Sequence, residues 1–229
     1  MAWPAGETYD FPLALAAGLE EASHTGGAGL RTGIIGPQIA DTYSFLHEPA
    51  QAARFLAASD PNDPTTMAEA PLLAGYAALD RGDLAAAAAP LEACWKAWLA
   101  DPLVRSISHD NPCIVGLAYG LTGRMAQAEA VFKQTGSWSR CFAVHGDVLE
   151  HAGDLAGAER LWARGIALAP DLPPVYLHRG ISELNRGDLA RAGADVAAAN
   201  ARAPHWADPL KAWGDLLARE GPWKDAVAK

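Results

Sequence analysis

The chain has 229 residues, of which 50% are hydrophobic, and a formal net charge of −9 at pH 7. This acidic balance argues against nucleic-acid binding, because no basic stripe is available to neutralise phosphates. No apolar run reaches about 18 residues, so we expect no membrane span. Alanine is the dominant apolar residue, which favours closely packed helices and disfavours strands.

The cysteines and the N-terminus bear on the compartment. Cys94, Cys113 and Cys141 are odd in number and widely spaced, so we expect small buried hydrophobic residues in a reducing compartment and no disulfide framework. Residues 1–7 have no basic region ahead of an apolar run and do not resemble a secretion signal. The expected location is the cytoplasm.

Residues 1–32 are the least regular part of the sequence. Asp10 is expected to cap an amphipathic helix that begins near Phe11 and carries Pro12 in its first turn. Gly26 and Gly27 disfavour continuation of that helix. We therefore expect an N-terminal capping helix followed by a linker.

The segment from Gly146 to Asp188 nearly repeats itself. Gly146 and Gly180 are 34 residues apart, and each is followed seven residues later by a Gly-Asp pair, then by an alanine, a large apolar residue and a proline. A period near 34 residues is typical of a helical repeat array. The sequence therefore predicts helix hairpins stacked in series.

The same pattern extends towards both ends of the chain. The pattern has four slots. The first-helix glycine slot holds Gly75, Gly116, Gly146, Gly180 and Gly214, and the turn slot seven residues later holds Gly82, Gly123, Gly153, Gly187 and Gly221. The alanine slot at offset twelve holds Ala87, Ala128, Ala158, Ala192 and Ala226, and the large apolar slot at offset sixteen holds Leu91, Phe132, Trp162 and Val196. A weaker first unit has Ala40, His47, Ala52 and Leu56 in these slots. The 41-residue interval after Gly75 predicts about seven extra residues near 101–109, and the 30-residue interval before Gly146 predicts a shortened helix near Gly136.

Each slot has a physical reason. Small residues let two antiparallel helices approach closely, and the large residue is expected to fill the groove between one hairpin and the next. The turn glycine takes the left-handed conformation that ends the first helix. The second helix is expected to be capped by Asp83, Asp154 and Asp188 and stopped by Pro64, Pro170 and Pro204, with the next first helix starting at Asn111-Pro112 and Asp208-Pro209.

This succession of small residue, Gly-Asp, alanine, large apolar residue and proline resembles the tetratricopeptide repeat (TPR) family over residues 33–229. The resemblance implies an all-α fold, a right-handed α-solenoid of TPR-like antiparallel helix hairpins. The longer repeat of the Sel1-like family fits the 34-residue spacing less well. The expected domains are residues 1–32 as capping helix and linker and 33–229 as an array of about six repeats, at 33–67, 68–108, 109–138, 139–172, 173–206 and 207–229, the last incomplete.

The resemblance also implies a binding surface, because the first helices of such arrays line a concave face. Carried over position by position, the expected partner-binding residues are Phe45, Tyr76, Asp80, Asp110, Arg140, Asp147, Glu150, His151, Asn185, Lys211, Asp215 and Arg219. Acidic residues outnumber basic ones on this face, which favours a protein or peptide partner that is basic or neutral. Phe45 and Tyr76 are the expected aromatic anchors. A chaperone-tail clamp for C-terminal carboxylates is not expected, because its slots hold Ala143, Val144 and Asp147.

The sequence holds no complete nucleotide-binding, metal-binding or nucleophile motif. The glycines at 27 and 29 begin a nucleotide-loop pattern, but Thr32 stands in place of its third glycine. The pairs His109 with Cys113 and His145 with His151 have no third and fourth metal ligand nearby in sequence. No Gly-x-Ser-x-Gly elbow is present. We therefore expect no catalytic residues, no metal and no cofactor.

Two functions fit this pattern. The first is a protein-protein interaction scaffold that binds a partner segment in the concave groove of a TPR array. The alternative is the regulatory or sensory TPR region of a larger enzyme or transcriptional regulator. The last hairpin stops before its large apolar slot, so we expect the chain to be a fragment, and sequence beyond Lys229 would distinguish the two.

Overall fold

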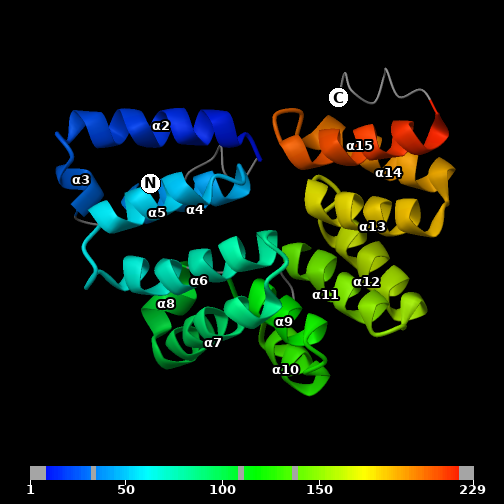
Figure 1. Cartoon of the computed structure of the whole chain (residues 1–229), viewed down its shortest axis with the longest axis horizontal. Coiled ribbons are helices and arrows are strands. Elements are labelled where there is room, and N and C mark those ends of the chain that lie inside the picture. Colours follow the sequence, from blue (N-terminus) through cyan, green and yellow to red (C-terminus); the bar gives the residue numbers. More distant parts are fainter. Residues whose placement is uncertain (1–8, 32–34, 108–110, 136–138, 222–229) are drawn as a thin grey trace. The chain divides into compact units, whose positions relative to one another are not determined.

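The computed structural model describes residues 9–31, 35–107, 111–135 and 139–221, and every regular element in these ranges is a helix (Figure 1). The predicted all-α class is confirmed. The helices are α2 (Phe11–His24), α3 (Ala28–Arg31), α4 (Ile35–Phe45), α5 (Pro49–Ala58), α6 (Pro64–Asp80), α7 (Leu84–Ala100), α8 (Pro102–Ile107), α9 (Asn111–Leu121), α10 (Met125–Thr135), α11 (Ser139–His151), α12 (Leu155–Leu168), α13 (Pro173–Arg186), α14 (Leu189–Arg202) and α15 (Ala207–Glu220).

The chain divides into two compact units. The described part of the first runs from Phe11 to Thr135, and that of the second comprises residues 139–221 with Tyr9 and Asp10. In the first unit the helix pairs α4 with α5, α6 with α7 and α9 with α10 pack together; in the second, α11 pairs with α12 and α13 with α14, and α15 packs on α13 and α14. The predicted boundaries of the domains and repeats stay predictions.

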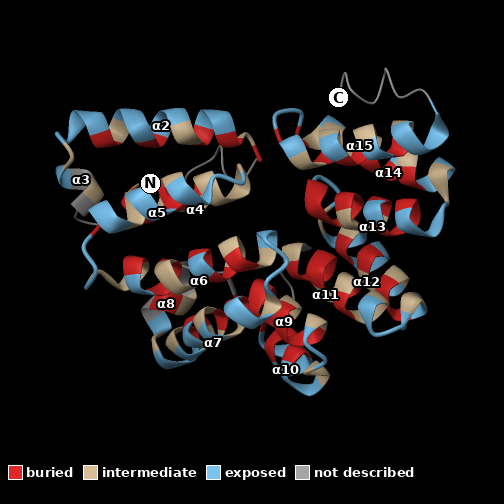
Figure 2. Cartoon of the chain, viewed as in Figure 1, coloured by how far each residue is buried: buried red, intermediate tan, exposed pale blue. Residues whose placement is uncertain are grey.

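The N-terminal helix forms as the sequence predicts. It begins at Phe11, and the chain leaves it through Gly26 and Gly27, both of which have positive φ. Its buried residues Phe11, Ala14, Gly18 and Ala22 lie on one side, and α2 packs with that side against α4 (Figure 2). Small residues at three of these positions allow the two helices to approach closely.

The predicted turn residues are confirmed. Positive φ values occur at Gly82, Gly123, Gly153, Gly187, Gly221 and His47, the residues of the turn slot. Gly187 shows why glycine is favoured: with φ of 84° it ends α13, and its amide donates to the carbonyl oxygens of Glu183 and Leu184. An L residue with a side chain adopts this left-handed conformation at a cost of roughly 1–2 kcal/mol.

The small-residue slots are also confirmed, with one correction. A Cβ atom added to each first-helix glycine would meet the large residue sixteen positions later, in the pairs Gly75 with Leu91, Gly116 with Phe132, Gly146 with Trp162 and Gly180 with Val196. The large residue therefore packs onto the glycine of its own hairpin and does not fill only the groove between hairpins. Trp162 does both, since it also belongs to a buried cluster with Val175 of α13. Ala87, Ala128, Ala158 and Ala192 have no exposed surface.

The caps are mostly as predicted. The carboxylates of Asp83, Asp154 and Asp188 accept hydrogen bonds from backbone amides of α7, α12 and α14. Two proline predictions are wrong: α5 already ends at Ala58, so Pro64 begins α6 behind its cap Asp63, and α15 begins at Ala207, which places Asp208 in its first turn. Residues 59–63 separate α5 from α6, and Trp206 is the residue that precedes α15.

Both irregular intervals have a structural counterpart. The extra residues after α7 form the short helix α8, and α10 has 11 residues where α12 and α14 have 14. The loss of three residues corresponds to almost one helical turn. The glycine spacing therefore predicted where the helices along the chain depart from the regular pattern.

The cysteines are buried, as predicted, but the expectation of three free thiols is wrong. Cys94 is free, and burial, with the charge of Glu69, raises its pKa to about 12. Cys113 and Cys141 are both disulfide-bonded. The predicted reducing compartment, and with it the cytoplasmic location, therefore loses this support. Within the described ranges, none of the helices is both long enough and apolar enough to cross a membrane.

Candidate functional site

In the first unit, three aromatic rings form a row. Phe45, the last residue of α4, stacks on Phe11 with ring centroids 4.7 Å apart and lies 6.4 Å from Tyr76 of α6. The structure thus brings together the two aromatic residues that we predicted as anchors. Phe45 has a ring on each side and supports the packing of α2 on α4, so its role towards a partner stays a prediction. Asp80 lies 3.3 Å from Nδ1 of His47.

In the second unit, α11 and α13 are joined by polar pairs. Nδ1 of His178 lies 2.5 Å from the carboxylate of Asp147, and both side chains are about three-quarters buried, with 27% and 29% exposed. Burial lowers the pKa of His178, but the charge and the hydrogen bond of Asp147 outweigh it, so the pKa is raised above 6.5. This pair closes one end of the junction between the two helices.

A second polar group lies further along the same junction. The hydroxyl of Ser182 donates to Glu150, and Arg186 lies 3.9 Å from Glu150 and 2.9 Å from Glu159 of α12. Glu150 is therefore held between α11 and α13. Its predicted role towards a partner stays a prediction, and its carboxylate is engaged within the unit.

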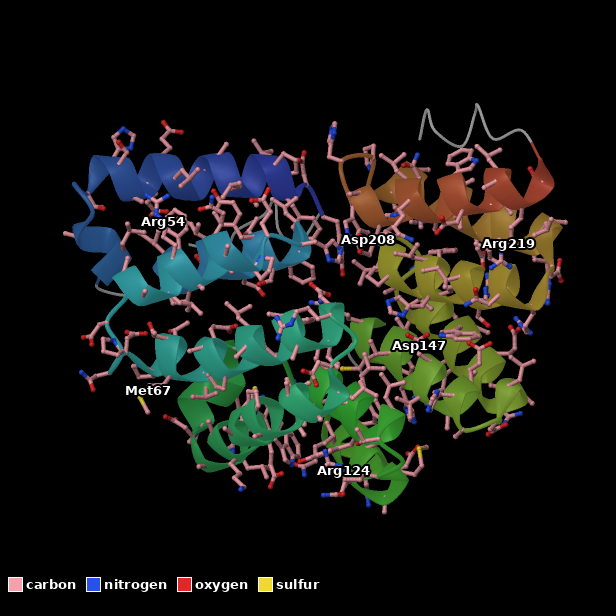
Figure 3. The ribbon with its side chains drawn as sticks, in the orientation of Figure 1. Arg54, Met67, Arg124, Asp147, Asp208 and Arg219 are labelled. Carbon is pink, nitrogen blue, oxygen red and sulfur yellow. The ribbon has the colours of Figure 1, made fainter. Side chains whose placement is uncertain are left out.

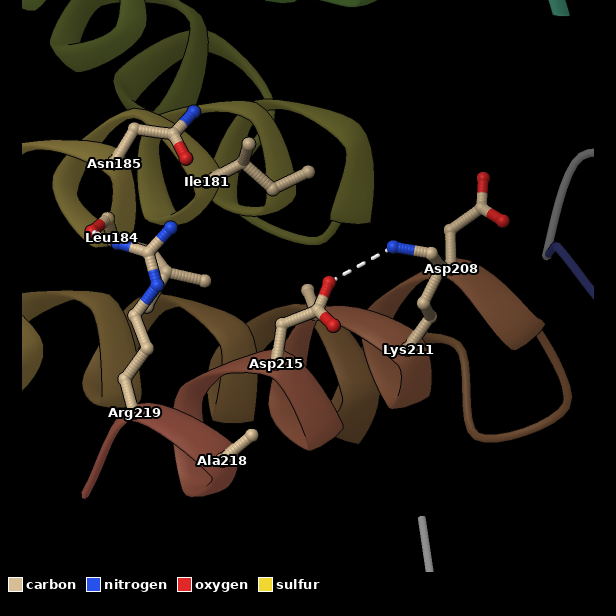
Figure 4. Close-up of a pocket in the computed structure, with 9 residues that line it drawn as sticks. Ile181, Leu184, Asn185, Asp208, Lys211, Asp215, Ala218 and Arg219 are labelled. Atoms are coloured by element: carbon tan, nitrogen blue, oxygen red, sulfur yellow. Dashed lines mark hydrogen bonds and ion pairs between the residues drawn. The ribbon is translucent and has the colours of Figure 1, made fainter. Parts of the chain in front are cut away.

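Between α13 and α15 the junction opens into a pocket of about 530 Å³ (Figure 4). The lining residues are Ile181, Leu184, Asn185, Asp208, Lys211, Ala212, Asp215, Ala218 and Arg219. Four of them, Asn185, Lys211, Asp215 and Arg219, belong to the residues predicted from the repeat frame. Apolar side chains form one part of the wall and charged or amide groups form the rest.

The 34-residue period relates the residues of this junction to those of the junction between α11 and α13. Moving 34 residues along the chain from Asp147 leads to Ile181, and moving the same distance from His178 leads to Ala212. A hydrogen-bonded imidazole and carboxylate at one junction therefore correspond to an isoleucine and a methyl group at the next. Ile181 is 39% exposed, because Ala212 is too small to cover it.

The charged side chains around the pocket differ in whether they form ion pairs. Lys211 Nζ lies 2.8 Å from Asp215, so these two neutralise each other. One nitrogen of Arg219 donates to the carbonyl of Leu184 at 2.5 Å. Within the part of the chain that the structure describes, no carboxylate pairs with Arg219, and the amide of Asn185 makes no side-chain hydrogen bond.

The remaining predicted residues are more scattered. Arg140 lies in the first turn of α11, His151 is its exposed last residue, and Asp110 lies outside the described residues. Figure 3 labels Asp147, Asp208 and Arg219 on the helices of the second unit. Among the described residues, no three histidine, cysteine or acidic side chains are grouped so that they could hold a metal ion.

Sequence reasoning missed the apolar half of the pocket. Ile181, Leu184 and Ala218 occupy the same repeat positions as Asp147 and Glu150, but these aliphatic residues were not among the predicted site residues. Repeat position, without a selection among residue types, would have found them.

No known protein-family model matches the chain, and no curated protein matches it in sequence. A functional proposal therefore rests on the residues and their geometry.

Proposed function

We propose that the chain is a TPR-like, right-handed α-solenoid that binds a segment of a partner protein along the first helices of its hairpins. The support is the recurrence of one packing unit: a glycine under a large residue sixteen positions later, a left-handed turn residue and an aspartate cap. Hairpins built in this way leave one side of each first helix free of its own partner helix.

The observation that carries the proposal is the open pocket between α13 and α15. Its walls come from consecutive first helices, and they combine exposed apolar surface with charged groups at the rim, which is the composition of a protein-binding surface. A side chain of a partner could be buried against Ile181 and Ala212 while its backbone contacts the polar groups around them.

The proposed partner is a protein or peptide and not a nucleic acid or a membrane. The first helices carry many carboxylates, including Asp147, Glu150, Asp208 and Asp215, and these favour a basic or neutral segment over a strongly acidic one. Phe45, Tyr76, Asp80 and Asp110 are proposed as contacts on the first unit, and Arg140, Asp147, Glu150, His151, Asn185, Lys211, Asp215 and Arg219 as contacts on the second. We propose a binding role without catalysis and without a cofactor. The cytoplasmic location stays a prediction, which the disulfide-bonded Cys113 and Cys141 do not support.

The proposal is tested by selecting peptides from a displayed random library against the whole chain and measuring their affinity by fluorescence polarisation. Ile181→Glu should weaken the selected peptides at least about tenfold, since it places a charge on the apolar wall. Leu168→Glu is the matched control, because Leu168 is also an exposed apolar residue, 58% exposed, but lies on the second helix α12. If no peptide is selected, or if both variants weaken binding equally, the proposal is wrong.

A further inference from the structure

We propose that the pocket between α13 and α15 recognises an extended peptide segment in which an apolar side chain and a carboxylate stand two residues apart. This inference rests on the proposed function and adds the chemistry of the partner at one pair of helices. The predicted preference for basic or neutral segments describes the first helices as a whole, and Arg219 makes this end of the pocket an exception.

The apolar requirement follows from the comparison of the two junctions. Between α11 and α13 the space is filled by the hydrogen-bonded pair His178 and Asp147. At the corresponding place between α13 and α15 the chain supplies Ala212 and Ile181, which make no polar contact and leave Ile181 39% exposed. An apolar side chain of a partner would cover this surface and remove it from water, which favours binding.

The need for a carboxylate in the ligand follows from N–H donors of Arg219 and Asn185 that make no hydrogen bond within the described chain. Arg219 and Asn185 stand at the same end of the pocket, one on α15 and the other on α13 (Figure 4). Arg219 uses one donor, for the carbonyl of Leu184, and in the described chain no carboxylate neutralises it. A guanidinium presents five N–H donors and an asparagine two, and a carboxylate accepts from both without leaving the surface. Lys211 does not compete, because Asp215 already neutralises it.

The distance between the apolar surface and the hydrogen-bond donors of the pocket determines how far apart the two groups stand in the ligand. Ile181 and Asn185 are four residues apart on α13, which is about 6 Å along a helix axis. In an extended peptide, side chains on the same face are two residues apart, at roughly 6.6 Å. An apolar residue over Ile181 therefore places the second residue along the segment beside Asn185 and Arg219. Asp208, at the opposite end of α15, repels a carboxylate there, so the acid is directed to Arg219.

The inference is tested with the peptide acetyl-Glu-Ala-Leu-Ala-Glu-amide, which presents a carboxylate two residues from leucine in both chain directions. Its affinity for the whole chain is measured by isothermal titration calorimetry beside two controls, one with alanine in place of leucine and one with glutamine in place of both glutamates. The parent peptide should bind, and each control should bind at least about tenfold more weakly. Equal affinity of parent and glutamine control would overturn the inference.

Variants of the protein locate the carboxylate. Arg219→Met should remove the advantage of the parent over the glutamine control and leave the affinity of the control unchanged, and Asn185→Ala should reduce that advantage. Lys96→Met is the matched control, because it also deletes one cation, on α7, from a side chain that is 73% exposed. Asn185 is exposed as well, so its variant remains informative if Arg219→Met fails to fold.

The outcomes separate this inference from the proposed function. If library-selected peptides bind and depend on Ile181 but the glutamate peptide does not bind, the acidic requirement is wrong and the binding role stands. If Lys96→Met weakens the parent as much as Arg219→Met does, the effect is one of net charge and the site is wrong. If no peptide of any kind binds, the proposed function fails.

Discussion

Replacing Gly146 by alanine should destabilise the second unit, because the new methyl group would lie against the indole of Trp162. A Cβ atom at this position would be 2.5 Å from Cε2 and 2.7 Å from Cδ1 of that ring. Trp162 has no exposed surface, and its Nε1 donates to the carbonyl of Ala143 at 3.1 Å. The ring therefore has neither empty space to move into nor freedom to rotate without losing a hydrogen bond.

The magnitude follows from three contributions. Overpacking a rigid buried ring costs roughly 1–3 kcal/mol. Loss of the hydrogen bond from Trp162 to Ala143 costs about 1 kcal/mol. Alanine returns about 1 kcal/mol, because it favours a helix interior over glycine. Gly146→Ala should therefore lower the free energy of unfolding by about 1–3 kcal/mol.

The assay is urea unfolding followed by far-UV circular dichroism, with two other glycine variants for comparison. A Cβ atom at Gly193 would meet only Cδ2 of Leu216, at 3.3 Å, so Gly193→Ala should be neutral or stabilising by up to about 1 kcal/mol. At Gly180 the nearest atoms are Cγ2 of Val196 at 3.1 Å, Cβ of Asp195 at 3.2 Å and the backbone nitrogen of Val196 at 3.3 Å, so Gly180→Ala should fall between the other two. Equal midpoints for Gly146→Ala and Gly193→Ala would refute the reasoning.

Three other predictions concern buried charges and a turn. Burial, and then the charge of Asp195, raises the pKa of Glu183 above its ordinary value of 4.5, so the ionised carboxylate lowers the free energy of unfolding as the pH rises past that value. In urea titrations, Glu183→Gln should therefore raise the free energy of unfolding over the wild type more near pH 7 than near pH 4. An equal gain at both pH values would contradict this prediction. The raised pKa of His178 means that its pair with Asp147 stabilises the fold fully below about pH 6.5, the unfolded value, and that this contribution is lost as the pH rises through the folded pKa. NMR titration should place the His178 pKa above 6.5, and Asp147→Asn should lower it; a wild-type value at or below 6.5 would show that burial wins. Gly187→Ala should cost roughly 1 kcal/mol, because φ is 84° there, and an unchanged urea midpoint would exclude strain at this turn.

The site was predictable in part. Asn185, Lys211, Asp215 and Arg219 were predicted from the family resemblance and their repeat positions, and all four line the pocket between α13 and α15. The opposite wall was missed, because an isoleucine or an alanine carries no chemical signature of binding. Whether such a residue is covered depends on the size of its neighbour on another helix, here Ala212, and not on its own type.

The sequence by itself determined the features that one backbone position or one close contact demands. A left-handed turn favours glycine, and two closely packed helices require a glycine beneath a large side chain, so the turns and these contacts within the hairpins were predictable from residue types at fixed spacing. The end of α5 and the start of α15 were not. Only the tertiary structure decided which polar groups neutralise one another, which junction stays open and which cysteines are oxidised. These depend on distances between side chains of different helices, and no single residue type records such a distance.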